Sequence, residues 1–95
     1  MFIILLKFSD NKAAAPDFME GHNQWLRQGF EDNVFMLAGS LQPGIGGGLL
    51  ARNASREEIE SRVAADPFVA ANIVAAEILE LSTAKASEQL AFLMD

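Results

Sequence analysis

The sequence predicts an α+β domain of the ferredoxin-like type, with the order βαββαβ, a four-stranded antiparallel sheet and a C-terminal helix. Three observations support this fold. Four short apolar segments have the composition of strands, two longer segments repeat apolar residues at the helical period, and Pro and Gly separate them. A chain of 95 residues has room for one hydrophobic core, so we treat residues 1–95 as a single domain.

The four expected strands cover residues 2–8, 34–41, 48–52 and 72–81. In the first two, neither set of alternate positions is polar. This pattern is typical of strands that are buried on both faces of their sheet. The glycine-rich segment of residues 44–48 follows the second strand, and we interpret it as a flexible hairpin connection.

The first helix is expected to begin at Pro16, because Pro suits the first helical position. We expect it to end at Gly29, because glycine commonly ends a helix. Five residues of this segment recur at the helical period and therefore share one face, which we expect to point toward the sheet: Phe18, His22, Trp25, Leu26 and Gly29.

The second helix is expected to begin with a capping box formed by Ser55 and Glu58. It should end near Ala65, because Pro67 disfavours helical geometry at the residue before it. The tail of residues 82–95 contains a short amphipathic helix, judged from apolar residues at the helical period: Ala86, Leu90, Leu93 and Met94.

Two helices can cover only one face of the predicted sheet, although both of its faces are apolar. The tail helix expected within residues 82–95 is too short to cover the second face by itself. We therefore expect an obligate homodimer in which two sheets pack face to face, about 10 Å apart, around a barrel-like interior. The alternative is that the tail helix alone covers the second face.

The composition argues against several classes of function. A net charge of −6 and a pI near 4.6 do not suit binding of nucleic acid through a basic face. The chain has no cysteine and one histidine, so we expect neither disulfides nor a Cys or His metal cluster. No flavin or nicotinamide signature is present in the sequence, and we predict no cofactor.

The N-terminal segment does not resemble a targeting signal. Residues 1–6 are apolar, but the run is too short and its basic residue, Lys7, follows it instead of preceding it. No segment approaches the roughly 20 apolar residues that a membrane-spanning helix needs. We therefore expect a cytoplasmic protein that does not bind a membrane.

Three short motifs share their spacing with a known family: a His before an aromatic-Leu pair in the first helix, a Gly-x-Leu after the second strand, and an Asp-Pro-Phe after the second helix. Here they are His22 with Trp25-Leu26, Gly39-Ser40-Leu41, and Asp66-Pro67-Phe68. Over residues 2–81 the chain thus resembles the YCII-related family of small dimeric α+β barrels. It departs from the family pattern where Ser40 replaces the usual Pro and where residues 82–95 extend the chain.

The resemblance implies a catalytic pair in a cavity, and the residues that match this pair are His22 and Asp66. An imidazole can gain and lose a proton near neutral pH, and a carboxylate can orient it and stabilise its charged form. Two structural alternatives remain open. His22 can be a hydrogen-bonded core residue, and Asp66 can be the N-cap of a short helix over residues 68–71, or serve both roles with one oxygen for each.

Ser40, Trp25 and Phe68 are the residues that we predict to contact a small-molecule ligand. Ser40 can donate a hydrogen bond, although the chain holds no second histidine to activate it as a nucleophile. For Trp25 the alternative is a position in the core. We assign no metal ligands.

The resemblance implies a cofactor-independent isomerase or lyase, because some relatives of this fold act on ring compounds such as lactones and chlorinated hydroxyquinols. His22 and Asp66 would transfer a proton on a small organic molecule, a contribution of about 10²–10⁴-fold in rate. One alternative is a non-catalytic small-molecule binding module or accessory subunit. Another is a structural protein that docks through its tail.

Overall fold

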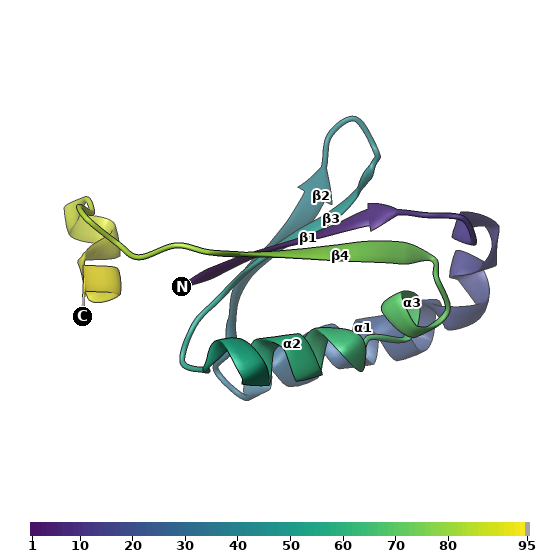
Figure 1. The fold of residues 1–95 in the computed structure, drawn as a ribbon, viewed down its shortest axis with the longest axis horizontal. Coiled ribbons are helices and arrows are strands. Elements are labelled where there is room, and N and C mark those ends of the chain that lie inside the picture. Colours follow the sequence, from purple (N-terminus) through teal and green to yellow (C-terminus); the bar gives the residue numbers. More distant parts are fainter. Residues whose placement is uncertain (95) are drawn as a thin grey trace.

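Four strands form one antiparallel sheet in the computed structural model, which describes residues 1–94 (Figure 1). They are β1 (Phe2–Phe8), β2 (Phe35–Leu41), β3 (Gly46–Ala51) and β4 (Val74–Glu80), arranged in the order β2-β3-β1-β4. This is the ferredoxin-like arrangement, so the predicted fold class is confirmed. The third strand starts earlier than predicted, because the last glycines of the hairpin already belong to it.

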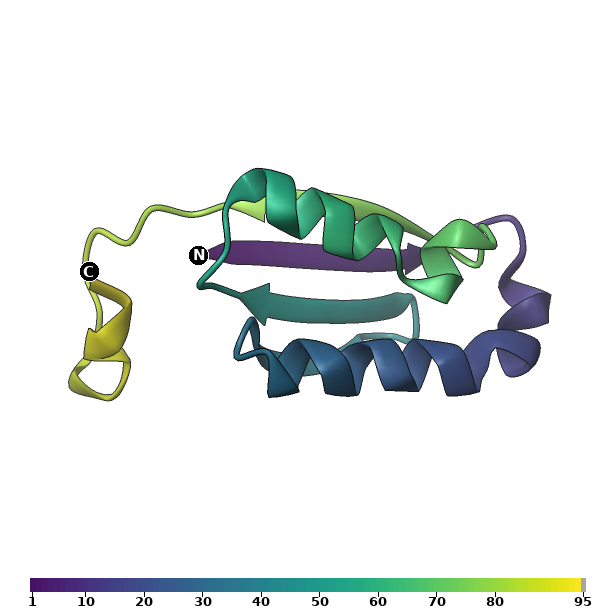
Figure 2. The ribbon, with the colours of Figure 1, turned by 90° about the horizontal axis from the view of Figure 1, so that it is seen from below.

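The α-helices lie together on one face of the sheet (Figures 1 and 2). A short 3₁₀ helix, η1 (Lys12–Ala14), leads into α1 (Ala15–Glu31). α2 (Arg56–Ala64) is followed closely by α3 (Pro67–Ala70). Within residues 1–94, no helix is both long enough and apolar enough to cross a membrane.

α1 does not stop at Gly29, as the sequence predicted, but continues to Glu31. Gly29 is buried inside the helix, and a Cβ at this position would lie 2.1 Å from the Phe35 ring. Such a distance is far below van der Waals contact. Glycine therefore permits a close approach of α1 to β2, and the chain turns afterwards at Asn33, whose φ is 60°.

The core lies between the helices and the sheet. Alternate residues of β1 and β3 point to this side and are buried, and apolar residues of α2 and of the loop before β4 complete the layer. Burial of each such large side chain is worth about 1.5–3 kcal/mol. The central members of this core are Phe2, Ile4, Leu6, Leu49, Ala51, Ile59, Val63 and Ile73.

Two polar contacts hold α1 against α2. The indole Nε1 of Trp25 donates to the carbonyl of Arg62 at 2.9 Å, and Arg62 Nη1 lies 3.0 Å from Asp32 Oδ2. Hydrogen bonds from Gln28 and Arg62 hold the pKa of Asp32 below its ordinary value of 3.8. These contacts help to keep the middle of α1, which carries the histidine, in place beside α2.

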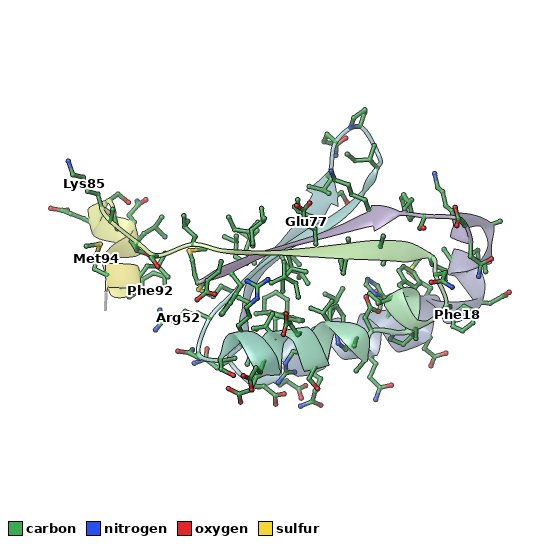
Figure 3. The ribbon with its side chains drawn as sticks, viewed as in Figure 1. Phe18, Arg52, Glu77, Lys85, Phe92 and Met94 are labelled. Atoms are coloured by element: carbon green, nitrogen blue, oxygen red, sulfur yellow. The ribbon has the colours of Figure 1, made fainter. Side chains whose placement is uncertain are left out.

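Within residues 1–94, no helix covers the second face of the sheet, and we call it the open face (Figure 1). Glu77 lies on this face and points away from the helices (Figure 3). Two leucines of this face, Leu37 and Leu79, are 55% and 42% exposed. From the strand registers, the apolar residues of the open face are Ile3, Leu5, Leu37, Leu41, Leu50 and Leu79.

The tail leaves β4 as an extended segment and ends in a 3₁₀ helix, η2 (Glu88–Met94), which is kinked at Leu90. It lies beyond one end of the sheet and covers neither face (Figures 1 and 2). The Arg52 guanidinium donates to the Phe92 carbonyl at 3.4 Å and sits 5.1 Å from the centre of its ring (Figure 3). The alternative in which the tail covers the second face of its own sheet is therefore wrong.

Candidate active site

Asp66 and Pro67 begin the short helix α3 in the way the sequence predicted. Asp66 has extended backbone geometry, and its Oδ1 accepts a hydrogen bond from the Phe68 N–H at 3.0 Å. Pro67 occupies the first turn, where its missing N–H leaves nothing unsatisfied. The cap fixes the carboxylate inside the protein, where Asp66 is 0% exposed.

The same carboxylate contacts the only histidine of the chain. His22 Nδ1 lies 2.8 Å from Asp66 Oδ1, although the two residues are far apart in the sequence. The imidazole stacks on the Phe68 ring, with centroids 4.0 Å apart and an angle of 5° between the planes. On another side it meets Trp25, with centroids 5.7 Å apart. These contacts leave the His22 side chain 13% exposed.

The Phe68 N–H and His22 Nδ1 contact the same carboxylate oxygen of Asp66. Asp66 Oδ1 accepts from the Phe68 N–H and pairs with His22 Nδ1, whereas Oδ2 is buried and has no hydrogen-bond partner within residues 1–94. The expectation that the cap and the histidine use different oxygens is therefore wrong.

If Asp66 is ionised, its contact with His22 also sets the tautomer of a neutral imidazole. A carboxylate that is ionised can only accept, so the nitrogen facing Asp66, Nδ1, carries the hydrogen. Nε2 is then the basic nitrogen, and it has no hydrogen-bond partner in the described part of the chain. A histidine held in this way by a carboxylate has the arrangement of a general base or acid.

His22 lines a pocket of about 360 Å³ between α1 and the sheet. Phe68 and Ser40 line it too, as the sequence predicted for ligand contacts, and Met19, Asn23 and Gly47 contribute further to its wall. Several lining residues, among them Met19, Asn23 and Ser40, are exposed, so the pocket opens to solvent. A single small organic molecule fits a cavity of this size.

Ser40 reaches this pocket because of an irregularity in β2. Phe35 pairs with Ala51, but Leu37 already pairs with Leu50, so Met36 is an extra residue in the strand. This β-bulge reverses the alternation of side chains after it. Without the bulge, Ser40 would lie on the opposite face from Phe35, whereas the observed register brings it to the helix side, paired with Gly47.

Trp25, which the sequence predicts to contact a ligand, does not line this pocket. Its ring packs edge-on against Phe35, with centroids 5.0 Å apart, and its N–H is engaged by Arg62. Trp25 therefore contacts the imidazole from outside this pocket. Phe18 also departs from its predicted inward stripe, because it is 39% exposed near the start of α1 (Figure 3).

Sequence reasoning missed Asn23 and Gly47. Asn23 follows the histidine directly, and a polar residue beside a predicted site residue was a usable signal. Gly47 belongs to a run of glycines whose individual faces only the strand register reveals. Within residues 1–94, no three His, Asp or Glu side chains gather as a group that could hold a metal ion.

The sequence matches the model of one known protein family. Residues 1–82 match the model of the YCII-related domain. The chain belongs to the YCII-related family. The resemblance inferred from the three motifs is thereby confirmed, and most of the tail lies beyond the matched residues.

Among solved structures, a similar fold occurs in 5-chloro-2-hydroxyhydroquinone dehydrochlorinase (TftG) from Burkholderia phenoliruptrix AC1100, in complex with 2,5-dihydroxybenzoquinone. The TM-score is 0.68 at 17% sequence identity, and the match covers 85% of this chain and 93% of the other. At this level of identity, the likeness establishes a shared fold. No curated protein matches the sequence significantly.

Proposed function

We propose that this YCII-related protein is a small homodimeric enzyme that uses His22 and Asp66 for acid–base chemistry of the isomerase or lyase type. The substrate is a small organic molecule that contains a ring. One observation carries the proposal: the His22–Asp66 contact of 2.8 Å lies beside a pocket of about 360 Å³, to which His22 contributes. The activity named for the TftG structure agrees with this choice of substrate.

The proposed chemistry needs one proton acceptor whose orientation is fixed by its neighbours. Nε2 of His22 removes a proton from an activated C–H or O–H group of the bound ring, and Asp66 stabilises the imidazolium that forms. The proton then returns at another atom, or a leaving group departs with the electron pair. Positioned acid–base catalysis of this kind contributes about 10²–10⁴-fold, which suits a substrate that is already activated.

The homodimer is supported by the open face. Its aliphatic side chains line a hollow of about 270 Å³, and the protein's own tail does not cover it. Exposed apolar patches of this kind typically mark interaction sites. A second copy of the same sheet is the partner with matching shape and chemistry.

The first test measures turnover of hydroxylated and chlorinated ring compounds, including 5-chloro-2-hydroxyhydroquinone, with chloride release and solvent-deuterium incorporation as readouts. We expect Asp66→Asn and His22→Gln each to lower kcat/KM by about 10²–10⁴-fold. Asp17→Asn is the matched control, because it removes a carboxylate from the same helix as His22 but on an exposed position. Its kcat/KM should stay at the wild-type value.

A second readout separates a catalytic pair from a merely structural one. Nitrogen-15 NMR of the imidazole should show hydrogen on Nδ1 in the wild type and a mixed or reversed tautomer in Asp66→Asn. If all compounds are inert yet still shift the His22 signals, the binding-module alternative replaces the enzyme. Wild-type kcat/KM in both site variants would contradict the proposal directly.

A further inference from the structure

On the sheet side of the candidate pocket, one strand position has no side chain. On the helix side of the sheet, the strand registers place four residues side by side in one row: Ser40 of β2, Gly47 of β3, Leu6 of β1 and Ala76 of β4. Gly47 is the one member of this row without a side chain, and it lines the pocket together with Ser40 and His22. His22 lines that pocket from the helix layer, and Gly47 from the sheet.

The fold itself does not require glycine at this position. Gly44 and Gly46 have φ values of 72° and 143°, and a Cβ on Gly46 would collide with the Leu6 carbonyl at 2.0 Å. Gly47 has no such φ, and its Cβ would meet only the Gly39 carbonyl oxygen within 4 Å, at an acceptable 3.4 Å. A glycine inside a strand weakens that strand and often marks a place where a ligand approaches the backbone closely.

We propose that Gly47 is the specificity-determining residue of the pocket: its missing side chain leaves room for one flat, hydroxyl-bearing ring between the sheet and His22. This inference rests on the proposed function and names the part of the wall that selects the substrate. A β-branched residue, which strands usually favour, would fill the space that the ring occupies. Ser40 Oγ and His22 Nε2 are the polar groups on either side that can bind ring hydroxyls.

The variants Gly47→Ala and Gly47→Val test the inference with chlorohydroquinone, under anaerobic conditions, as the probe. Ligand-observed NMR gives the Kd, and the His22 imidazole signals report occupancy of the pocket. Ala76→Val is the matched control, because Ala76 lies on the other side of Leu6 in the same row and does not line the pocket. Circular dichroism and Tm report folding in each variant.

We expect Gly47→Ala to raise the Kd about tenfold and Gly47→Val to abolish measurable binding, by analogy with the effect of one methylene group in an enzyme pocket. Ala76→Val should bind as the wild type does. The Tm of Gly47→Val should be equal to or above the wild-type value, so lost binding is not lost folding. If the valine variant does not fold, the alanine variant decides.

Wild-type affinity in a folded Gly47 variant would overturn the inference while leaving the proposed function intact. Conversely, weakened binding in the Gly47 variants together with undiminished turnover in Asp66→Asn would support the inference about the pocket and refute the catalytic pair. A wild-type protein that does not bind the probe at millimolar concentration would overturn the assignment of this pocket to a ring.

Discussion

Both faces of the sheet carry many apolar side chains, but helices cover only one of them. On the helix side, Ile4 is fully buried and belongs to the core, and the same layer holds the His22–Asp66 pair. On the open face, the neighbours Ile3 and Leu5 are only half-buried. The comparison teaches that hydrophobicity alone does not show which face of the sheet forms the core; the helices that cover one face do.

The largest effect is expected from a charge on the open face. Leu5→Asp would place a carboxylate in the proposed sheet-to-sheet contact, where an unpaired buried charge costs several kcal/mol. The dimer Kd should rise more than about 1000-fold, because each 1.4 kcal/mol is a factor of ten. Light scattering would then give the mass of one chain at micromolar concentration.

Phe18→Asp is the control for this experiment, since it introduces the same carboxylate at an exposed apolar position on α1, away from the open face. It should keep the mass of the wild type. A wild-type protein that already has the mass of one chain would refute the homodimer, and so would a dimer of undiminished stability in Leu5→Asp.

Adjacent isoleucines of β1 sharpen the comparison between the two faces. Ile4→Ala should lower the free energy of unfolding by about 2–5 kcal/mol, because it leaves a cavity in a fully covered layer. Ile3→Ala should cost less, and its cost should depend on protein concentration, because mass action couples dimer contacts to stability. Urea denaturation at several protein concentrations measures both. Equal, concentration-independent losses would show that the open face is not an interface.

The cap of α2 provides a smaller, pH-dependent effect. Ser55→Ala should cost about 1 kcal/mol at pH 7, as is usual for an N-cap. The hydrogen bonds from the Ser55 backbone and side chain hold the pKa of Glu58 below its ordinary value of 4.5. A carboxyl group whose pKa is lowered in the folded state stabilises the fold at pH values above its unfolded-state pKa. That contribution disappears as the pH falls through its folded-state pKa.

The difference between wild type and Ser55→Ala should therefore be smaller at pH 3 than at pH 7, measured by urea denaturation at both values. A difference that grows at low pH would contradict the assignment of the Glu58 shift to this capping box. Both proteins should keep the same mass, because Ser55 is remote from the open face.

The smallest effect is expected from the tail. Ending the chain at Ser82 removes the Arg52–Phe92 contact, which is exposed, and should change the free energy of unfolding by no more than about 0.5 kcal/mol. Thermal denaturation and light scattering check stability and mass together. A truncated protein that no longer dimerises would show that the tail contributes to the interface, in addition to the open face.

Much of the fold could be predicted from the sequence, because its signals are local. The Ser55–Glu58 capping box and the Asp66–Pro67 helix start depend on residues within one turn of each other, and both are present. From the sequence, the contact between His22 and Asp66 could be predicted only through the family motif. No short-range rule connects two residues on different helices, and the structure shows their side chains 2.8 Å apart.

The sequence by itself determined the order of strands and helices, the capped start of α3 and the apolar character of both sheet faces. Only the tertiary structure decided that Ser40 faces the pocket, that Trp25 lies outside it and that one Asp66 oxygen serves two donors. The reason is physical. Caps and periodicity act within a turn of chain, whereas a side chain's face and its neighbours follow from strand register and from the bulge at Met36, which depend on pairing between distant segments.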